Sequence, residues 1–330
     1  MAQAPESPAR RYGKVFDEIA DEYDRHRPTY PDELIDHACK VGGLTGGDHV
    51  LEVGCGSGQL TGSLLARGLR VTAVEPGKSL VALATKNMAG AGEVKFVNAQ
   101  FENASLPREQ FTAVFSASAF HWVDPEVSWR KVADALVPGG TFALVQYFGL
   151  DEPRSKRDQE AALDAMRKVA PEIAADWPTY RDLEGTLAGI QQRRGNISAA
   201  WAWLGSYGIG RDYAASLFGD VDAALMPKLI DVTPDEANGL LRTMSFYARL
   251  SEAQRQALQR EYESIYMQFG RPIRASTVTA LVTARRTTGT HTCTPALGNG
   301  RADCQGDDHS GCASAEEGEH NSAAQQQEQH

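Results

Sequence analysis

The stretch Glu52-Val53-Gly54-Cys55-Gly56-Ser57-Gly58 decides the fold of this chain. The residues at 50–53 are apolar, partly β-branched and followed by glycine, which predicts a short buried strand. Glycines at alternate positions allow positive φ angles and let the backbone approach a ligand. From Gln59 onward, leucines at 60, 64 and 65 predict a helix. A strand, a glycine loop and a helix start in this order place exposed amide groups against a nucleotide-like ligand.

The residues around the loop distinguish between nucleotides. A dinucleotide fingerprint requires its third glycine at position 59, where this chain has Gln59. The next apolar run, 71–74, ends at Glu75, where an acid can accept hydrogen bonds from both ribose hydroxyls. Glu52 adds negative charge, which suits an ammonium or sulfonium group and repels a pyrophosphate. These residues favour S-adenosylmethionine over NAD, and an ordinary glycine-rich turn is the simpler alternative.

Three segments resemble one known family. The form E-x-G-x-G-x-G, with an acid at the end of the second strand, resembles the first motif of class I S-adenosylmethionine-dependent methyltransferases. The segment Ala119-Phe120-His121-Trp122 resembles a loop of small-molecule methyltransferases, including the trans-aconitate methyltransferase group. Tyr23-x-x-x-Arg27-Pro28-x-Tyr30-Pro31 resembles the segment that folds over the cofactor in these relatives. The resemblance is specific over about 16–147 and looser over 221–286.

Strands and helices alternate through the first half of the chain. Strands are predicted at 50–53, 71–74, 94–97, 113–116 and 141–147, and helices at 14–23, 31–40, 60–67, 78–88 and 126–136. This order predicts an α/β fold with a doubly wound parallel sheet. Later segments predict strands at 221–232 and 277–283 and helices at 233–241 and 251–269. The resemblance implies a Rossmann-like seven-stranded sheet, whose last strand runs antiparallel beside the fifth, and a helical insertion that forms an acceptor lid.

We expect three regions along the chain. They are a flexible N-terminus at 1–12, a methyltransferase domain at 13–286 and a disordered acidic tail at 287–330. Within the domain we expect a core at 41–150, a helical insert at about 152–220 and a C-terminal part at 221–286. The tail has seven acidic residues and one basic residue, which gives it −6 of the net charge of −10.

Composition limits the partners that we expect. The chain has no basic stripe and lacks the Asp/Asn-Pro-Pro-aromatic signature of enzymes that methylate bases, so we expect no nucleic-acid partner. The tail cysteines lack C-x-x-C spacing, so we expect no metal. The longest apolar stretch is too short for a membrane span, and the first 13 residues lack a signal-peptide core, so we expect a cytoplasmic protein.

The resemblance implies a set of cofactor-binding residues around the loop. The glycines would pass under the ribose and methionine part, Arg27 would pair with the methionine carboxylate, and Gln100 would meet the adenine. For Phe101 the alternative is core packing, and for Arg27 it is a surface position. The full set is Tyr23, Arg27, Glu52, Gly54, Cys55, Gly56, Gly58, Glu75, Pro76, Gln100, Phe101, Ser116, Ala117 and Phe120.

His121 is the candidate catalytic residue. An imidazole that titrates near neutrality can take a proton from a hydroxyl or amine acceptor, and the alternative is a histidine that only fixes its loop. Aromatic residues are available to line an acceptor pocket or to form the core of the later helices: Trp177, Tyr180, Trp201, Trp203, Tyr207, Phe246 and Tyr247. The segment 243–247 resembles one that faces the active site.

The function that we expect is S-adenosylmethionine-dependent methylation of a small organic acceptor, most simply O-methylation of a carboxylate or a hydroxyl. Two other functions stay open. A nicotinamide-dependent oxidoreductase shares the fold, although Gln59 and the lack of a Tyr-x-x-x-Lys proton relay speak against it. A non-catalytic S-adenosylmethionine-binding protein would keep the glycine loop and lose the acceptor pocket.

Overall fold

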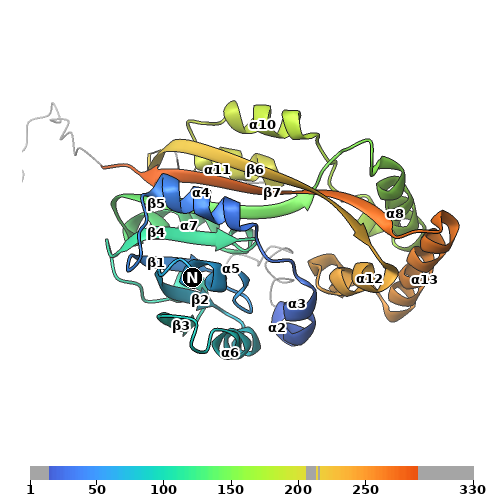
Figure 1. Ribbon diagram of the computed structural model, residues 1–330, viewed down its shortest axis with the longest axis horizontal. Helices are drawn as coiled ribbons and strands as arrows, with labels where there is room; N and C mark the ends of the chain where they lie inside the picture. Colours follow the sequence, from blue (N-terminus) through green and yellow to red (C-terminus); the bar gives the residue numbers. More distant parts are fainter. Residues whose placement is uncertain (1–14, 206–212, 215, 289–330) are drawn as a thin grey trace, which may run out of the picture. The chain divides into compact units, whose positions relative to one another are not determined.

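The computed structural model describes residues 15–205, 213–214 and 216–288. The expected flexible segment at 1–12 and nearly all of the expected acidic tail therefore lie outside the described residues. Helices and strands below carry the labels of Figure 1.

One mixed sheet organises the described residues, with the strand order β3-β2-β1-β4-β5-β7-β6. Strands β1 to β5 pair in parallel, and β7 runs antiparallel between β5 and β6 (Figure 1). The predicted Rossmann-like sheet with an antiparallel last strand beside the fifth is therefore confirmed. The strands are β1 His49–Val53, β2 Arg70–Glu75, β3 Val94–Asn98, β4 Phe111–Ala117, β5 Leu136–Gly149, β6 Phe218–Val232 and β7 Ile273–Arg286.

Helices cover both faces of this sheet because successive strand residues point to opposite faces. On one face, Val50 belongs to an apolar cluster with α4 (Asp32–Gly42) and α5 (Gln59–Leu65). On the other, Leu51 belongs to a cluster with α7 (Pro125–Ala135), α10 (Leu183–Gln191) and α11 (Ile197–Gly205). The short 3-10 helices η1 (Phe101–Asn103) and η2 (Phe120–Trp122) follow β3 and β4. The carboxyl ends of β1, β2 and β4 thus meet at one edge of the sheet.

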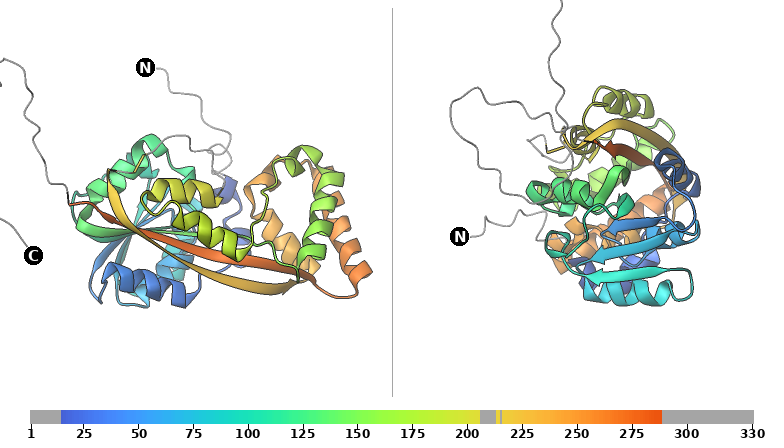
Figure 2. Two further views of the ribbon diagram at one scale, coloured as in Figure 1. Left: turned by 90° about the horizontal axis from the view of Figure 1, so that it is seen from above. Right: turned by 90° about the vertical axis from the view of Figure 1, so that its left-hand side faces the viewer.

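A third apolar cluster lies at the end of the long β6–β7 pair, away from the first two. It contains α8 (Lys156–Val169), α9 (Pro171–Ala174), α12 (Pro234–Arg242), η3 (Ser245–Arg249) and α13 (Glu252–Phe269). Figure 2 shows β6 and β7 running from the central sheet to these helices. The insert that we expected as one lid is therefore divided, because α8 and α9 join this cluster whereas α10 and α11 pack on the sheet.

The N-terminal helices α2 (Val15–Glu18) and α3 (Ala20–His26) connect these parts. They contact α6 (Lys78–Asn87) beside the sheet, and α3 also contacts α12 of the third cluster (Figure 1). A Cβ atom on Gly239 of α12 would lie 2.3 Å from Nδ1 of His26, so α12 can approach α3 this closely only without a side chain there. The single helix predicted over 14–23 is interrupted at Ile19. Among the described residues, no helix is long and apolar enough to cross a lipid bilayer.

Candidate functional site

The glycine loop follows β1 and is held by contacts that leave no room for side chains. Gly54, Gly56 and Gly58 have φ angles of +75°, +56° and +99°. A Cβ atom on Gly54 would lie 2.3 Å from Cβ of Ala119, in the loop after β4. A Cβ atom on Gly56 would lie 3.2 Å from Cε1 of Tyr23 in α3. The loop backbone is therefore enclosed by two segments that are distant in sequence.

Glu75, at the end of β2, is hydrogen-bonded to the main chain of this loop. Its Oε2 accepts a hydrogen bond of 3.1 Å from the amide of Gly56, and its Oε1 accepts one of 2.9 Å from the amide of Gly77. Burial raises the pKa of Glu75, and the two amide hydrogen bonds oppose that shift. Each carboxylate oxygen has two lone pairs, so Glu75 retains capacity to accept hydrogen bonds from ribose hydroxyls.

Asn98 fixes the main chain beside Glu75, a role that the sequence did not indicate. Its Nδ2 atom donates hydrogen bonds of 3.0 Å to the main-chain oxygens of both Glu75 and Pro76. Pro76, an expected site residue, is thereby held between β2 and β3 with Glu75. The only sequence signal for Asn98 is its place at the carboxyl end of β3.

Two expected loop residues turn their side chains away from a ligand. The carboxyl group of Glu52 accepts a hydrogen bond of 2.6 Å from Oγ1 of Thr61 in α5, and burial raises its pKa to about 7. Its negative charge at neutral pH is therefore smaller than we expected. The Cys55 thiol is 4% exposed within the apolar cluster below the loop, and burial raises its pKa well above the usual value. Cys55 thus offers only its main chain to a ligand.

The expected adenine segment forms η1, and helix α7 holds it in place. Gln100 Oε1 accepts a hydrogen bond of 3.1 Å from Nδ2 of Asn103, while the Phe101 ring is 3% exposed in the core. Lys131 of α7 donates hydrogen bonds of 3.0 and 2.6 Å to the main-chain oxygens of Glu102 and Ala104. The Phe101 side chain therefore packs in the core, which was the alternative to a cofactor contact. Of the two expected residues, only Gln100 has a side chain outside the core.

The loop after β4 separates into a core part and a part that faces the N-terminal helices. Ser116 and Ala117 lie in the strand, and Oγ of Ser116 donates a 2.8 Å hydrogen bond to the main-chain oxygen of Val53. Phe120 is 3% exposed and packs edge-on against Trp129 and Phe142 in the core. Because its ring lies inside the core, Phe120 supports the loop from beneath and does not line the pocket described below.

His121 lies on the other side of this loop. Its ring is 4.7 Å from that of Trp122, which packs against Phe16 of α2 at 5.8 Å. Burial, with a smaller effect from Arg27, lowers the pKa of His121 to about 3. The imidazole is therefore neutral at physiological pH, and its conjugate acid is too strong for efficient general-base catalysis.

Arg27 follows α3 and lies between the sheet and the third cluster. Its Nη2 donates a hydrogen bond to the main-chain oxygen of Thr243, and its Cζ lies 5.1 Å from the centre of the Tyr23 ring. Its buried Nε has no hydrogen-bond partner within the described ranges, and the same holds for Nε2 of Gln59. Buried donors without partners are costly, so these two atoms are available to bind a polar ligand or water.

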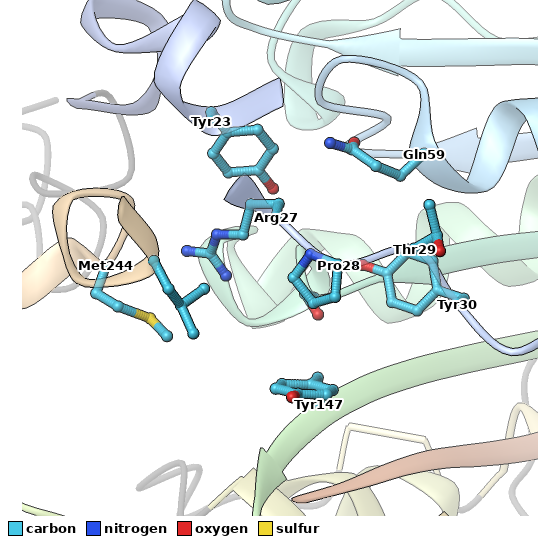
Figure 3. A pocket seen from close by; sticks show the side chains of 10 residues that line it. Tyr23, Arg27, Pro28, Thr29, Tyr30, Gln59, Tyr147 and Met244 are labelled. Atoms are coloured by element: carbon cyan, nitrogen blue, oxygen red, sulfur yellow. The ribbon is translucent and has the colours of Figure 1, made fainter. Parts of the chain in front are cut away.

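A pocket joins these residues, and Figure 3 shows Arg27 between Tyr23 and Met244, with Tyr147 across from them. It encloses about 430 Å³, including space open to solvent. Arg27 is the only charged member of the lining, and most of the other members carry hydroxyl or amide groups. The lining residues are Tyr23, Arg27, Pro28, Thr29, Tyr30, Gln59, Ser118, Tyr147, Leu240 and Met244.

Several of these lining residues were missed by sequence reasoning. Gln59, Ser118 and Tyr147 each follow or end a strand at the carboxyl edge of the sheet, a position that could have identified them. Ser118 has a φ of +52°, a conformation that is strained for a residue other than glycine and often found at functional sites. No sequence pattern identified Leu240 as a pocket residue, because only the packing of α12 on α3 brings it to the pocket.

The aromatic residues expected around an acceptor lie in different places. Trp201 is 1% exposed in the sheet core, and Trp203 packs between Arg181 and Arg193. Trp177, Phe246 and Tyr247 pack against the third cluster, and the Tyr180 ring lies against Gly149. Tyr207 lies outside the described residues. The aromatic wall nearest the glycine loop is thus formed by tyrosines of the pocket lining and not by tryptophans.

Comparison with known proteins identifies the class of domain. Residues 51–144 match the family model described as "Methyltransferase domain". An uncharacterized methyltransferase of Mycobacterium tuberculosis is 35% identical over 160 residues, 48% of this chain and 59% of that protein. A probable S-adenosylmethionine-dependent methyltransferase of Saccharomyces cerevisiae is 30% identical over 129 residues, 38% of this chain and 44% of that protein. The chain thus spans about three-fifths of the length of the mycobacterial relative.

The structural comparison supports the same fold. A candidate type II methyltransferase from Anaeromyxobacter dehalogenans has a TM-score of 0.53 at 24% identity, covering 79% of this chain and 97% of that one. Together with the matched segment 51–144, the Rossmann-like fold supports a class I S-adenosylmethionine-dependent methyltransferase domain. None of the relatives named above is a trans-aconitate methyltransferase, so that finer resemblance stays a prediction.

Proposed function

We propose that this protein methylates a small organic carboxylate on oxygen, using S-adenosylmethionine. One observation carries the proposal: the Glu75 carboxylate binds the Gly56 amide at the edge of a pocket whose single charged residue is Arg27. Glu75 is the acid that would bind the ribose, and Arg27 is the cation that would bind a carboxylate.

The residues present fit the cofactor. Glu75 would bind the ribose hydroxyls, Gly54–Gly58 would lie beneath the ligand, and Gln100 would meet the adenine. The unpartnered Nε of Arg27 and Nε2 of Gln59 are donors that suit the methionine carboxylate. When bound, S-adenosylmethionine supplies an electrophilic methyl group on a positively charged sulfur. The chain's own contribution is to hold the two reactants in line and to exclude water, which is worth up to ~7–11 kcal/mol.

The acceptor class follows from the chemistry of the pocket lining. Burial raises the pKa of both Tyr23 and Tyr30, so these phenols stay protonated and can donate hydrogen bonds. With the hydroxyl groups of Ser118 and Tyr147, and apart from the Arg27 and Gln59 donors assigned to the methionine carboxylate, they make a lining that can donate hydrogen bonds and has no acidic side chain. Such a lining favours an anionic acceptor over a neutral one.

The absence of an effective base favours the same class. A hydroxyl acceptor must lose a proton, and the pKa of about 3 makes His121 a poor acceptor of it. A carboxylate is already deprotonated at neutral pH and needs no base. This argument supports the alternative role of His121, in which the imidazole fixes its loop.

The test begins with binding. Calorimetric titration with S-adenosylhomocysteine should give micromolar binding that is lost in Glu75→Ala, while NAD should not bind. Turnover of labelled S-adenosylmethionine is then compared between matched pairs of organic acids and their alcohols. Binding of NAD in place of S-adenosylhomocysteine would support the oxidoreductase, and binding without turnover of any acceptor would support a non-catalytic protein. Turnover of alcohols alone would contradict the carboxylate assignment.

A further inference from the structure

One side-chain amide outside the pocket connects the glycine loop to the N-terminal helices. Asn87 is the last residue of α6 and is exposed. Its Nδ2 atom donates a hydrogen bond of 3.1 Å to the main-chain oxygen of Ser57 and one of 3.0 Å to Oδ1 of Asp24. A primary amide nitrogen has two N–H groups, so both are used. Ser57 belongs to the glycine loop and Asp24 to α3.

The position of Asp24 determines where two pocket residues lie. Tyr23 precedes it in α3, and Arg27 follows one helical turn later, at the end of the same helix. Tyr23 contacts Gly56, and the Arg27 guanidinium lies over the Tyr23 ring. A displacement of Asp24 would therefore move both side chains relative to the glycine loop.

A second contact holds the same helices at the opposite end of α6. Oδ1 of Asp17, in α2, accepts hydrogen bonds of 2.6 and 3.1 Å from the amides of Ser79 and Leu80. Helix α6 has no side-chain cap of its own, so Asp17 satisfies amides that its first turn leaves unpaired. Asp17 thus attaches the N-terminal helices to the start of α6, and Asn87 attaches them to its end.

We propose that Asn87 is a positioning residue for the amino-acid end of the cofactor: by binding Ser57 and Asp24 at once, it sets Arg27 and Tyr23 at the correct distance from the glycine loop. This inference rests on the proposed function. Asn87 touches neither cofactor nor acceptor, so it acts through Arg27. Its loss should weaken recognition of the methionine part and leave recognition of the adenosine part unchanged.

The experiment compares two ligands that differ in that part. Calorimetry on the full chain measures S-adenosylhomocysteine and 5′-methylthioadenosine, which lacks the amino-acid group, with the wild type, Asn87→Ala and Asp24→Ala. Both variants should raise the Kd for S-adenosylhomocysteine by about threefold to tenfold, the range for a lost hydrogen bond, with little change for 5′-methylthioadenosine. Lys86→Ala is the matched control, because Lys86 is the exposed neighbour and makes no side-chain hydrogen bond within the described part of the chain.

A double variant separates positioning from a general effect on the fold. In an Arg27→Ala background, Asn87→Ala should cost much less affinity, because interacting residues are not additive. An equal loss for both ligands, full additivity with Arg27→Ala, or an unchanged Kd in Asn87→Ala would each overturn the inference while the proposed function stands. If the wild type bound neither ligand, the proposed function would fail and the inference with it.

Discussion

Nη2 of Arg27 lies 2.5 Å from the main-chain oxygen of Thr243, although the two residues are 216 positions apart in sequence. This hydrogen bond joins the segment over the glycine loop to the C-terminal end of α12, which belongs to the third apolar cluster. One of the guanidinium's donors is therefore used inside the protein, and the buried Nε remains for a ligand. In the proposed function, Arg27 therefore connects the part of the pocket that binds the cofactor to the wall that α12 supplies.

Replacing Arg27 should weaken cofactor binding selectively. We expect Arg27→Ala to raise the Kd for S-adenosylhomocysteine about tenfold or more, because a charged hydrogen bond to a carboxylate is lost. The Kd of Arg27→Lys should lie between those of the wild type and Arg27→Ala, because lysine keeps the positive charge but lacks the planar set of guanidinium donors. Calorimetry at fixed ionic strength measures both, and an unchanged Kd in Arg27→Ala would remove this residue from the site.

Adding one methyl group at Gly54 should destabilise the protein for two reasons that can be separated. The φ of +75° disfavours alanine, and the new Cβ would lie 2.3 Å from Cβ of Ala119. Gly43→Ala is the matched control, since Gly43 has a φ of +67° and a Cβ atom added there would have no neighbour within 4 Å. We expect a cost of about 1–2 kcal/mol for Gly43→Ala and about 1–3 kcal/mol more for Gly54→Ala.

A compensating substitution tests the steric part of this cost. Gly54→Ala with Ala119→Gly should recover the additional loss, because the colliding atom is gone. Urea denaturation measures the free energy of unfolding for the wild type, the two single variants and the double variant. If the double variant were no more stable than Gly54→Ala, the contact with Ala119 would not be what excludes a side chain.

Glu52 should make the protein less stable as the pH rises. Burial raises its pKa to about 7 in the folded state, above the value of about 4.3 in an unfolded chain. Between these values the folded state binds the extra proton, so stability is lost as the pH increases through this window. Glu52→Gln removes the titrating group, and the stability of the variant relative to the wild type should rise by about 2–3 kcal/mol between pH 5 and pH 8.

The control for Glu52 is an acid that is exposed to solvent. Glu33→Gln makes the same chemical change at an exposed carboxyl group in the first turn of α4, so it controls for the replacement of a glutamate by a glutamine. Burial also raises the pKa of Glu75, and comparing each variant with the wild type at every pH removes the contribution of that residue. A stability difference for Glu52→Gln that did not change with pH would show that Glu52 is ionised at neutral pH.

His121 should contribute little as a proton acceptor. With the pKa of the imidazole near 3, we expect His121→Ala to retain turnover within about tenfold, whereas loss of a general base costs about 10²–10⁴-fold. The kcat/KM profile of the wild type should show no ionisation near 6.5 that disappears in the variant. A loss beyond a hundredfold with an unchanged Kd for S-adenosylhomocysteine would restore the base assignment.

The sheet could be predicted from the sequence because its signals are local. The apolar run before Gly54 and the acid at Glu75 mark the ends of β1 and β2 within a residue or two. The break at Ile19 could not be predicted, because the apolar pattern of the N-terminal segment continues across it. That break is set by tertiary contacts, in which Phe16 packs on Trp122 and Asp17 binds the start of α6.

The sequence predicted which segments of main chain form the site, but it predicted the directions of their side chains less well. The sequence places Glu52 and Phe120 next to the expected ligand, but it does not say which way a side chain turns. Glu52 turns to Thr61, and Phe120 turns to Trp129, because burial against those neighbours outweighs exposure in the pocket. Leu240 comes from far downstream, where no local pattern refers to the glycine loop, whereas Met244 lies in the segment 243–247, which resembles one that faces the active site.

The separate third cluster has a consequence for how such a protein can diversify. Leu240 of α12 and Met244, which precedes η3, supply one wall of the pocket, and this part of the chain packs with α8, α13 and the ends of β6 and β7 that lie in the third cluster. Substitutions at Leu240 and Met244 can reshape the acceptor wall while the Arg27–Thr243 hydrogen bond and the packing of α12 on α3 are kept. Evolution can thus exchange one acceptor for another while the ancestral cofactor chemistry is conserved, and directed evolution for new acceptors should begin in α12 and η3.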